Sequence, residues 1–92
     1  MPQTKNIIIK FSSKAQKQLP KLPLAIINKL EKQVDFLIQD RQHPSLHTKK
    51  FQGSVDFWEA RINYHYRFTF EIEEEVITIL SVGPHDEGLG KN

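Results

Sequence analysis

The stretch Phe57–Phe70, FWEARINYHYRFTF, decides the fold of this chain. Apolar and polar residues alternate on both sides of Tyr64 and His65, and the side chains of a β-strand point alternately to its two faces. The stretch therefore predicts two antiparallel strands joined by a tight turn near these two residues. Aromatic and β-branched side chains favour such a pleated, half-buried surface. The apolar face takes Trp58, Ala60, Ile62, Tyr66, Phe68 and Phe70.

The polar face of this hairpin carries Glu59, Arg61 and Arg67 on neighbouring strands. We expect Arg67 to point away from the aromatic core, so that its truncation leaves folding nearly intact. A carboxylate and two guanidiniums fit a solvated face with cross-strand ion pairs, and they also fit a site for a charged ligand. The alternation alone leaves both interpretations open.

Two helices are predicted between a first strand, Asn6–Phe11, and the central hairpin. Ser12 and Ser13 are helix-capping residues that open a short first helix. Pro23 fits the first turn of a second helix that runs to about Gln42. The apolar stripe of the second helix holds Ile26, Ile27, Leu30, Val34, Leu37 and Ile38. Its solvent side is assigned to Lys29, Lys32, Gln33 and Asp40.

The remaining segments predict two more strands. After a loop at Gln42–Ser45, Leu46–Gln52 is the strand that precedes the hairpin. Glu73–Glu75 form the next turn, and the nearly continuous apolar run Val76–Val82 is a central strand. The order is β-α-α-β-β-β-β, which predicts an α+β fold with a mostly antiparallel sheet and a two-helix hairpin packed on one face. We expect one domain over residues 1–92.

Charge is unevenly distributed along the chain. Residues 1–70 hold twelve Lys or Arg and five Asp or Glu, a net charge of +7, whereas residues 71–92 have a net charge of −5. A basic body suggests a polyanionic partner such as nucleic acid, although lysine-rich helices can also simply be soluble. The chain has no cysteine, signal peptide or membrane-span pattern, so we expect a cytoplasmic protein that has no contact with membranes.

The grouping on the polar face suits cleavage of RNA. A base must take the proton of a ribose 2′-hydroxyl, cations must stabilise the charge on the phosphate, and an acid must protonate the leaving 5′-oxygen. Glu59, Arg61 and Arg67 supply a carboxylate and two guanidinium forks that match phosphate oxygens. The end of the last strand brings His85 to the edge of the same face. These four residues are the candidate catalytic set.

Three motifs together resemble a known family. LHTKKFQG, WEARINYHYRFTFEI and ITILSVGPHDE look like the core of the RelE/ParE superfamily of bacterial toxins from type II toxin–antitoxin systems, whose fold resembles that of microbial ribonucleases. The resemblance covers nearly the whole chain. In the RelE-like branch it implies a ribosome-dependent mRNA endonuclease that a cognate antitoxin neutralises. The ParE-like branch implies a non-catalytic inhibitor of DNA gyrase, and a degenerate toxin that acts only as a binding partner is a third alternative.

The resemblance carries over residue by residue. Arg67 matches the strand arginine that RelE-like nucleases use on the scissile phosphate, and Arg61 lies where they often have a basic residue. Glu59 falls where the best-known members carry a lysine, so the base would be chemically different here. His85 falls where relatives place an arginine or histidine. Several members also use a tyrosine near the C-terminus, and this chain has none after Tyr66.

Lys49, Lys50 and His47 are the candidate RNA-binding residues, because ribosomal RNA is the surface that such a toxin meets. Alternation sends Lys49 and Lys50 to opposite faces, and both also fit ordinary strand lysines that discourage edge pairing. His43 and His47 flank a loop and are expected to be solvated. The four histidines show no spacing typical of a metal site, so we expect neither a metal nor another cofactor.

Overall fold

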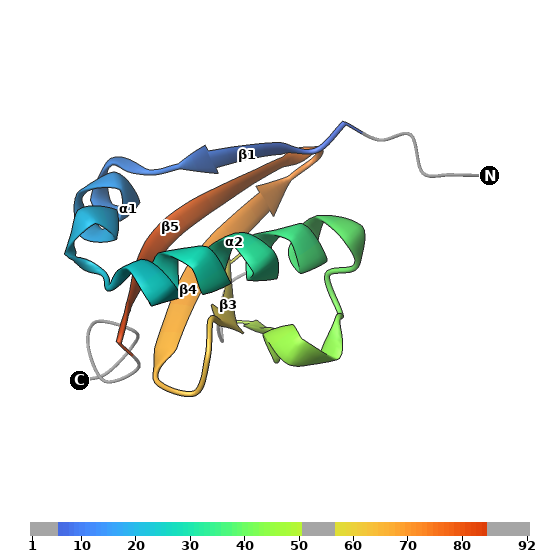
Figure 1. The fold of residues 1–92 in the computed structure, drawn as a ribbon. Coiled ribbons are helices and arrows are strands. Elements are labelled where there is room, and N and C mark those ends of the chain that lie inside the picture. Colours follow the sequence, from blue (N-terminus) through green and yellow to red (C-terminus); the bar gives the residue numbers. More distant parts are fainter. Residues whose placement is uncertain (1–5, 51–56, 85–92) are drawn as a thin grey trace.

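The computed structural model describes residues 6–50 and 57–84 (Figure 1). It is an α+β structure whose five strands form one sheet in the order β1-β5-β4-β3-β2. The pairing of β1 with β5 is parallel and the other three pairings are antiparallel, which confirms the predicted fold class. The elements are β1 (Ile8–Phe11), α1 (Ser13–Gln18), a 3₁₀ helix (Leu19–Lys21), α2 (Leu24–Gln39), a second 3₁₀ helix (Pro44–Leu46), β2 (Lys49–Lys50), β3 (Phe57–Arg61), β4 (Tyr66–Glu73) and β5 (Val76–Pro84).

Both helices contribute to one apolar core on one face of the sheet, and α2 lies across the strands (Figure 1). The predicted apolar residues of the hairpin occupy this face, where Phe68 and Phe70 are almost fully buried. No helix in residues 6–50 or 57–84 is long and apolar enough to cross a membrane. The buried apolar residues are Ala15, Ile26, Leu30, Leu37, Leu46, Ala60, Ile62, Phe68, Phe70, Ile77, Ile79 and Val82.

Helix α1 is joined to strand β5 by side-chain hydrogen bonds. The Ser12 hydroxyl caps the helix by accepting from the backbone N–H of Ala15 (3.1 Å), and it donates to the carbonyl oxygen of Leu80 (2.8 Å). The Gln18 side-chain oxygen accepts from the backbone N–H of Val82 (2.7 Å). Of the two predicted capping residues, Ser12 is therefore the cap, because its hydroxyl satisfies an amide of the first turn.

The prediction for the solvent side of α2 is wrong at Gln33, which is only 1% exposed. Its amide nitrogen donates to the carbonyl oxygens of Arg61 (2.8 Å) and Ser45 (3.2 Å). A polar side chain can be buried when its groups find such partners, so Gln33 lies within the core-facing stripe. The helix ends at Gln39, because Asp40 is extended and its carboxylate accepts from the N–H of Gln42 (3.0 Å).

The segment before β2 also differs from the prediction. Leu46 belongs to a 3₁₀ helix and is fully buried, and the described part of the predicted Leu46–Gln52 strand is Lys49–Lys50. The turn forms because Pro44 favours a helical start and the ring nitrogen Nδ1 of His43 accepts from the N–H of Ser45 (3.2 Å). The His43 ring stacks on Phe36 at 3.9 Å between centroids, so His43 is half-buried rather than solvated.

Candidate functional site

Strands β3 and β4 bring two arginines directly opposite one another. Arg61 pairs with Arg67, and Arg67 pairs on its other side with Gly83 of β5. Both arginines alternate with core residues, so both lie on the sheet face away from the helices, as predicted. Gly83 is buried, and a Cβ added there would meet no described atom within 4 Å.

The turn between these strands is held by the side chain of Asn63. Its Oδ1 atom accepts from the backbone N–H groups of His65 (2.8 Å) and Tyr66 (2.9 Å), and the N–H of Ile62 donates to the carbonyl oxygen of Tyr66 (2.8 Å). The side chain thus satisfies two amides that a tight turn leaves without strand partners. This confirms the predicted turn at Tyr64 and His65 and gives it a defined geometry.

Arg67 adds a second set of bonds to the same turn. Its Nη1 atom donates to the carbonyl oxygens of Asn63 (2.8 Å), Tyr64 (2.8 Å) and Tyr66 (3.2 Å), and the side chain is only 8% exposed. The expectation that Arg67 can be truncated without a cost in folding does not fit this environment, because three carbonyl oxygens would lose a charged donor. The Nε and Nη2 atoms make no hydrogen bond to a described residue.

Arg61 is placed differently from its neighbour. Its Nε atom is buried and has no hydrogen-bond partner among the described residues, and its backbone carbonyl is held by Gln33 of α2. Neither Arg61 nor Arg67 forms an ion pair within residues 6–50 and 57–84. Two like charges directly opposite on adjacent strands repel one another. The pair therefore concentrates positive charge that no described carboxylate neutralises.

Glu59 lies on the same face, two positions before Arg61, and its partners in the sheet are Lys49 on β2 and Thr69 on β4. It makes no hydrogen bond or ion pair with the described part of the chain. Of the two interpretations left open by the alternation, cross-strand ion pairs are absent among the described residues of this face. Glu59 therefore shares a face with the arginines and makes no hydrogen bond or ion pair with them.

The polar face is more enclosed than the alternation predicts. Glu59 is 9% exposed, and Thr69 and Ser81 are buried, with their hydroxyl oxygens 2.6 Å apart. Strand β4 has a neighbour on each side, so its short side chains are shielded by the adjacent strands. The middle of the polar face is therefore enclosed, and the candidate site lies at the end that carries the two arginines.

The three candidate RNA-binding residues do not gather at one place. Lys49 pairs with Glu59 and so lies on the polar face, whereas Lys50 pairs with Trp58 and its Nζ atom lies 5.6 Å from the centre of the Trp58 ring on the helix-covered face. This separation confirms the predicted alternation and removes Lys50 from the arginine site. His47 is exposed in a left-handed conformation after the second 3₁₀ helix. His85 lies outside the described residues.

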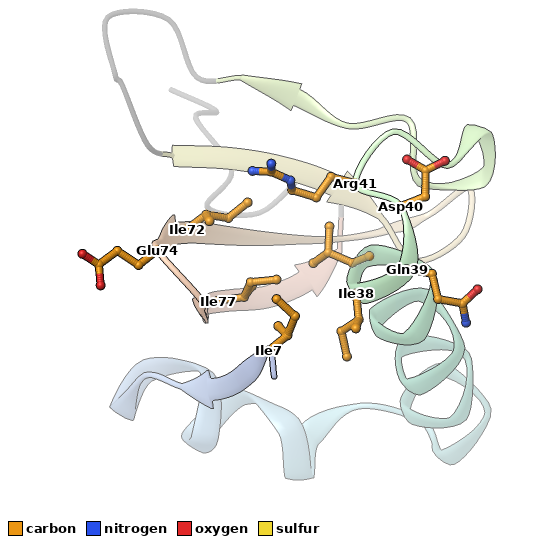
Figure 2. A pocket seen from close by; sticks show the side chains of 9 residues that line it. Ile7, Ile38, Gln39, Asp40, Arg41, Ile72, Glu74 and Ile77 are labelled. Carbon is orange, nitrogen blue, oxygen red and sulfur yellow. The ribbon is translucent and has the colours of Figure 1, made fainter. Parts of the chain in front are cut away.

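The hollow at the end of α2 is a different kind of surface (Figure 2). This cleft of about 530 Å³ opens on the helix-covered face and includes neither arginine of the polar face. Figure 2 shows isoleucines from α2, β4, β5 and the residue before β1 gathered at its centre, with the carboxylates of Asp40 and Glu74 pointing away from them. Apolar side chains at the centre of a cleft supply no hydrogen-bond donors or positive charge to stabilise a phosphate. Its isoleucines are Ile7, Ile38, Ile72 and Ile77.

The described residues contain no group of three His, Asp or Glu side chains that could hold a metal ion.

Sequence reasoning found the arginine pair through the alternation of the hairpin, but it did not find the two residues that hold the pair in place, Gln33 and Asn63. Both left a signal. Gln33 is three residues after Leu30 and four before Leu37, which puts it in the apolar stripe, and asparagine is common in tight turns because its side chain bonds the backbone two residues on.

The model of the family described as ParE toxin of type II toxin-antitoxin system, parDE, matches residues 9–89. The chain belongs to this family. The protein is therefore a toxin of the RelE/ParE superfamily, as the hairpin and its flanking motifs predicted. A search of curated proteins finds no match to this toxin.

Solved structures support the fold of the toxin. RelE in the archaeal RelE–RelB complex from Pyrococcus horikoshii is 23% identical, with 89% of this chain and 98% of that chain covered and a TM-score of 0.73. YafQ from E. coli is 14% identical, with coverages of 92% and 100% and a TM-score of 0.75. YoeB from Staphylococcus aureus, solved as a dimer, is 18% identical, with coverages of 86% and 97% and a TM-score of 0.73.

Proposed function

We propose that this toxin is an endoribonuclease that cleaves mRNA on the ribosome, and that Arg61 and Arg67 bind the scissile phosphate. The observation that carries the proposal is the directly opposed arginine pair, which no described carboxylate neutralises. An isolated pair of like charges destabilises a sheet, so its presence favours an anionic ligand between or above the two strands. Guanidinium groups suit phosphate because their forked donors match its oxygens.

The two arginines support complementary roles. Arg67 is fixed by three turn carbonyls and has unused donors on Nε and Nη2, so it acts as a preorganised cation at the phosphate. Arg61 is less restrained by side-chain bonds and carries an unpartnered Nε. A phosphate oxygen bound by the terminal nitrogens of Arg61 would offset part of the repulsion between the two guanidiniums.

The proposed chemistry is an internal transfer at phosphorus. Glu59 takes the proton of the ribose 2′-hydroxyl, the 2′-oxygen bonds to phosphorus, and the bond from phosphorus to the 5′-oxygen breaks. The sequence-based candidate for the acid that protonates the 5′-oxygen is His85. Lys49 lies on the same face beside Glu59 and supports a contact with a neighbouring phosphate. We keep exposed His47 as a second contact, and we give Lys50 no role at the scissile phosphate.

Arg61→Gln is the decisive test, because Arg61 makes no side-chain hydrogen bond in the described chain whereas Arg67 holds a turn. We expect this variant to fold normally and to cleave mRNA about a hundredfold more slowly, the scale for loss of one charge donor to the reacting phosphate. The measurement is primer extension on cellular mRNA after brief induction, with circular dichroism as the folding control. Lys14→Gln, an exposed change on α1, is the matched control for loss of one positive charge. Cleavage by folded Arg61→Gln at the wild-type rate would remove the arginine pair from the mechanism.

A non-catalytic inhibitor of DNA gyrase is the second candidate, because the matching family model is named for ParE. The same induction experiment separates the two functions. Cuts in mRNA that keep a fixed phase with the codons support the nuclease. Intact transcripts together with a DNA-damage response support gyrase inhibition, and in that case Glu59 should be replaceable by Gln without loss of toxicity.

We also propose that the toxin is held inactive in the cytoplasm by a small antitoxin protein. Two of the similar structures are toxins crystallised with RelB and DinJ, and DinJ–YafQ is described as a toxin–antitoxin complex. A basic site favours an acidic or amphipathic segment that folds on binding. Co-expression with the adjacent reading frame should yield a complex at native expression levels, and a toxin that is fully active and alone under those conditions would contradict this proposal.

A further inference from the structure

The turn that joins the strands of Arg61 and Arg67 displays two exposed rings. Tyr64 is 74% exposed, and its ring meets that of His65 edge to face, at 5.1 Å between centroids and 85° between planes. The Tyr64 ring makes no other ring contact in the described chain and takes no part in the apolar core. The Tyr64 ring therefore has no role in the apolar core, and its exposed faces are accessible to a ligand.

The turn that carries Tyr64 is unusually well held for an exposed loop. Asn63 binds two amides of the turn from one side, and Arg67 binds the carbonyl oxygens of Asn63 and Tyr64 from the other. The backbone of Tyr64 is therefore fixed relative to the Arg67 guanidinium. A ligand that contacts both groups meets a preorganised surface and loses less entropy on binding than it would at a mobile loop.

The charge around the turn selects the class of ligand. Residues 60–70 contain two arginines and a histidine and no carboxylate. Aromatic side chains next to arginines are typical of surfaces that bind single-stranded RNA, where an unstacked base lies on a ring and its phosphate meets a cation. An acidic peptide would satisfy the arginines equally well, but it would make no particular use of an exposed aromatic face.

We propose that the β3–β4 turn is a nucleobase-binding platform, on which Tyr64 stacks with a base of single-stranded RNA next to the phosphate bound by Arg61 and Arg67. His65 is a positioning residue that supports the Tyr64 ring with its edge contact. The platform rests on the proposed nuclease function and extends it, since it assigns the contact that orients the RNA relative to the arginines. Stacking is tolerant of sequence, so the platform selects single strands rather than a particular base.

The test uses a fluorescein-labelled 2′-O-methyl RNA hexamer, which cannot be cleaved because its 2′-oxygens are blocked, and a hexamer of the same backbone without bases. Fluorescence anisotropy measures binding of both probes to the full chain. Tyr64→Ala should weaken binding of the base-bearing probe by about tenfold, the scale for loss of one stacked base, and Tyr64→Phe should bind as the wild type does. The probe without bases should bind Tyr64→Ala and wild type equally.

Leu24→Ala is the matched control, because Leu24 is 71% exposed and lies at the start of α2. It should leave binding of both probes unchanged. The proposal is overturned if Tyr64→Ala binds the base-bearing probe as the wild type does, if it weakens both probes equally, or if the wild type binds neither. Loss of antitoxin binding by Tyr64→Ala with unchanged RNA binding would also overturn it and would assign the turn to a protein partner.

Primer extension on cellular mRNA separates failure of the platform from failure of the nuclease function. If wild type and Tyr64→Ala cut mRNA at the same rate and bind the base-bearing probe equally, the platform is wrong and the nuclease stands. If the wild type cuts no mRNA but its binding of the base-bearing probe depends on Tyr64, the nuclease function is wrong and the platform stands.

Discussion

The two ends of strand β4 are opposite in charge and in the way their turns are held. At its start, the β3–β4 turn is bound by Asn63 and by the Arg67 guanidinium, and it lies between the two arginines. At its end, the β4–β5 turn consists of exposed glutamates, and Glu74 has a positive φ of 56°. One end of the strand thus favours an anionic ligand and the other end repels it.

This difference shows how a chain with a formal net charge of only +2 can present a strongly cationic site. The acidic turn lies a strand length away from the arginines, so its charges are largely screened from them at physiological salt. For the RNA ligand that we propose, this difference favours approach to the arginine end of β4 over the acidic end. The comparison also predicts that substitutions at the two turns have opposite effects on stability.

The largest expected effect on stability is at Arg67. Arg67→Ala removes a charged donor from three turn carbonyls and should lower the free energy of unfolding by about 2–4 kcal/mol. Urea denaturation monitored by circular dichroism measures the change. Arg61→Ala, directly opposite, is the control and should change stability far less, because its side chain makes no hydrogen bond in the described chain. Equal effects of the two variants would show that the turn does not depend on the Arg67 bonds.

A smaller loss is expected at Asn63 in the same turn. Asn63→Ala removes the acceptor of two backbone amides and should lower the free energy of unfolding by about 1–2 kcal/mol. Asn63→Asp keeps an acceptor oxygen and should retain most of the stability. The same denaturation experiment checks both variants, and an Asp variant as unstable as the Ala variant would argue against the side-chain bonds seen here.

The smallest effect, and the only gain, is expected at the acidic turn. Glu74→Gly should raise the free energy of unfolding by about 0.5–1 kcal/mol, because a positive φ is strained for a residue with a Cβ and glycine adopts it without strain. The rise in melting temperature measures this gain. Glu75→Gly removes the same charge where φ is not positive, so it should not stabilise the protein. A gain of equal size in both variants would assign the effect to charge repulsion instead.

Much of the fold follows from local patterns of the sequence. Alternation over Trp58–Phe70 determined the hairpin, its turn and the face on which Arg61 and Arg67 lie, because side-chain direction on a strand depends only on the position along it. The same alternation predicted that Lys49 and Lys50 lie on opposite faces of the sheet. Motif order was sufficient to identify the RelE/ParE superfamily, since the strands that carry the motifs also build the sheet.

Tertiary structure alone decided which polar side chains are buried and what they bind. Gln33 lies in the core because a carbonyl of β3, far along the chain, accepts its proton, and Arg67 became a structural residue as well as a candidate site residue because the turn carbonyls point at it. Burial and hydrogen-bond partners depend on contacts between distant segments, which a local pattern does not contain. The sequence thus determined where the arginines lie, and the folded chain decided that Arg67 also holds the turn whereas the Arg61 side chain does not.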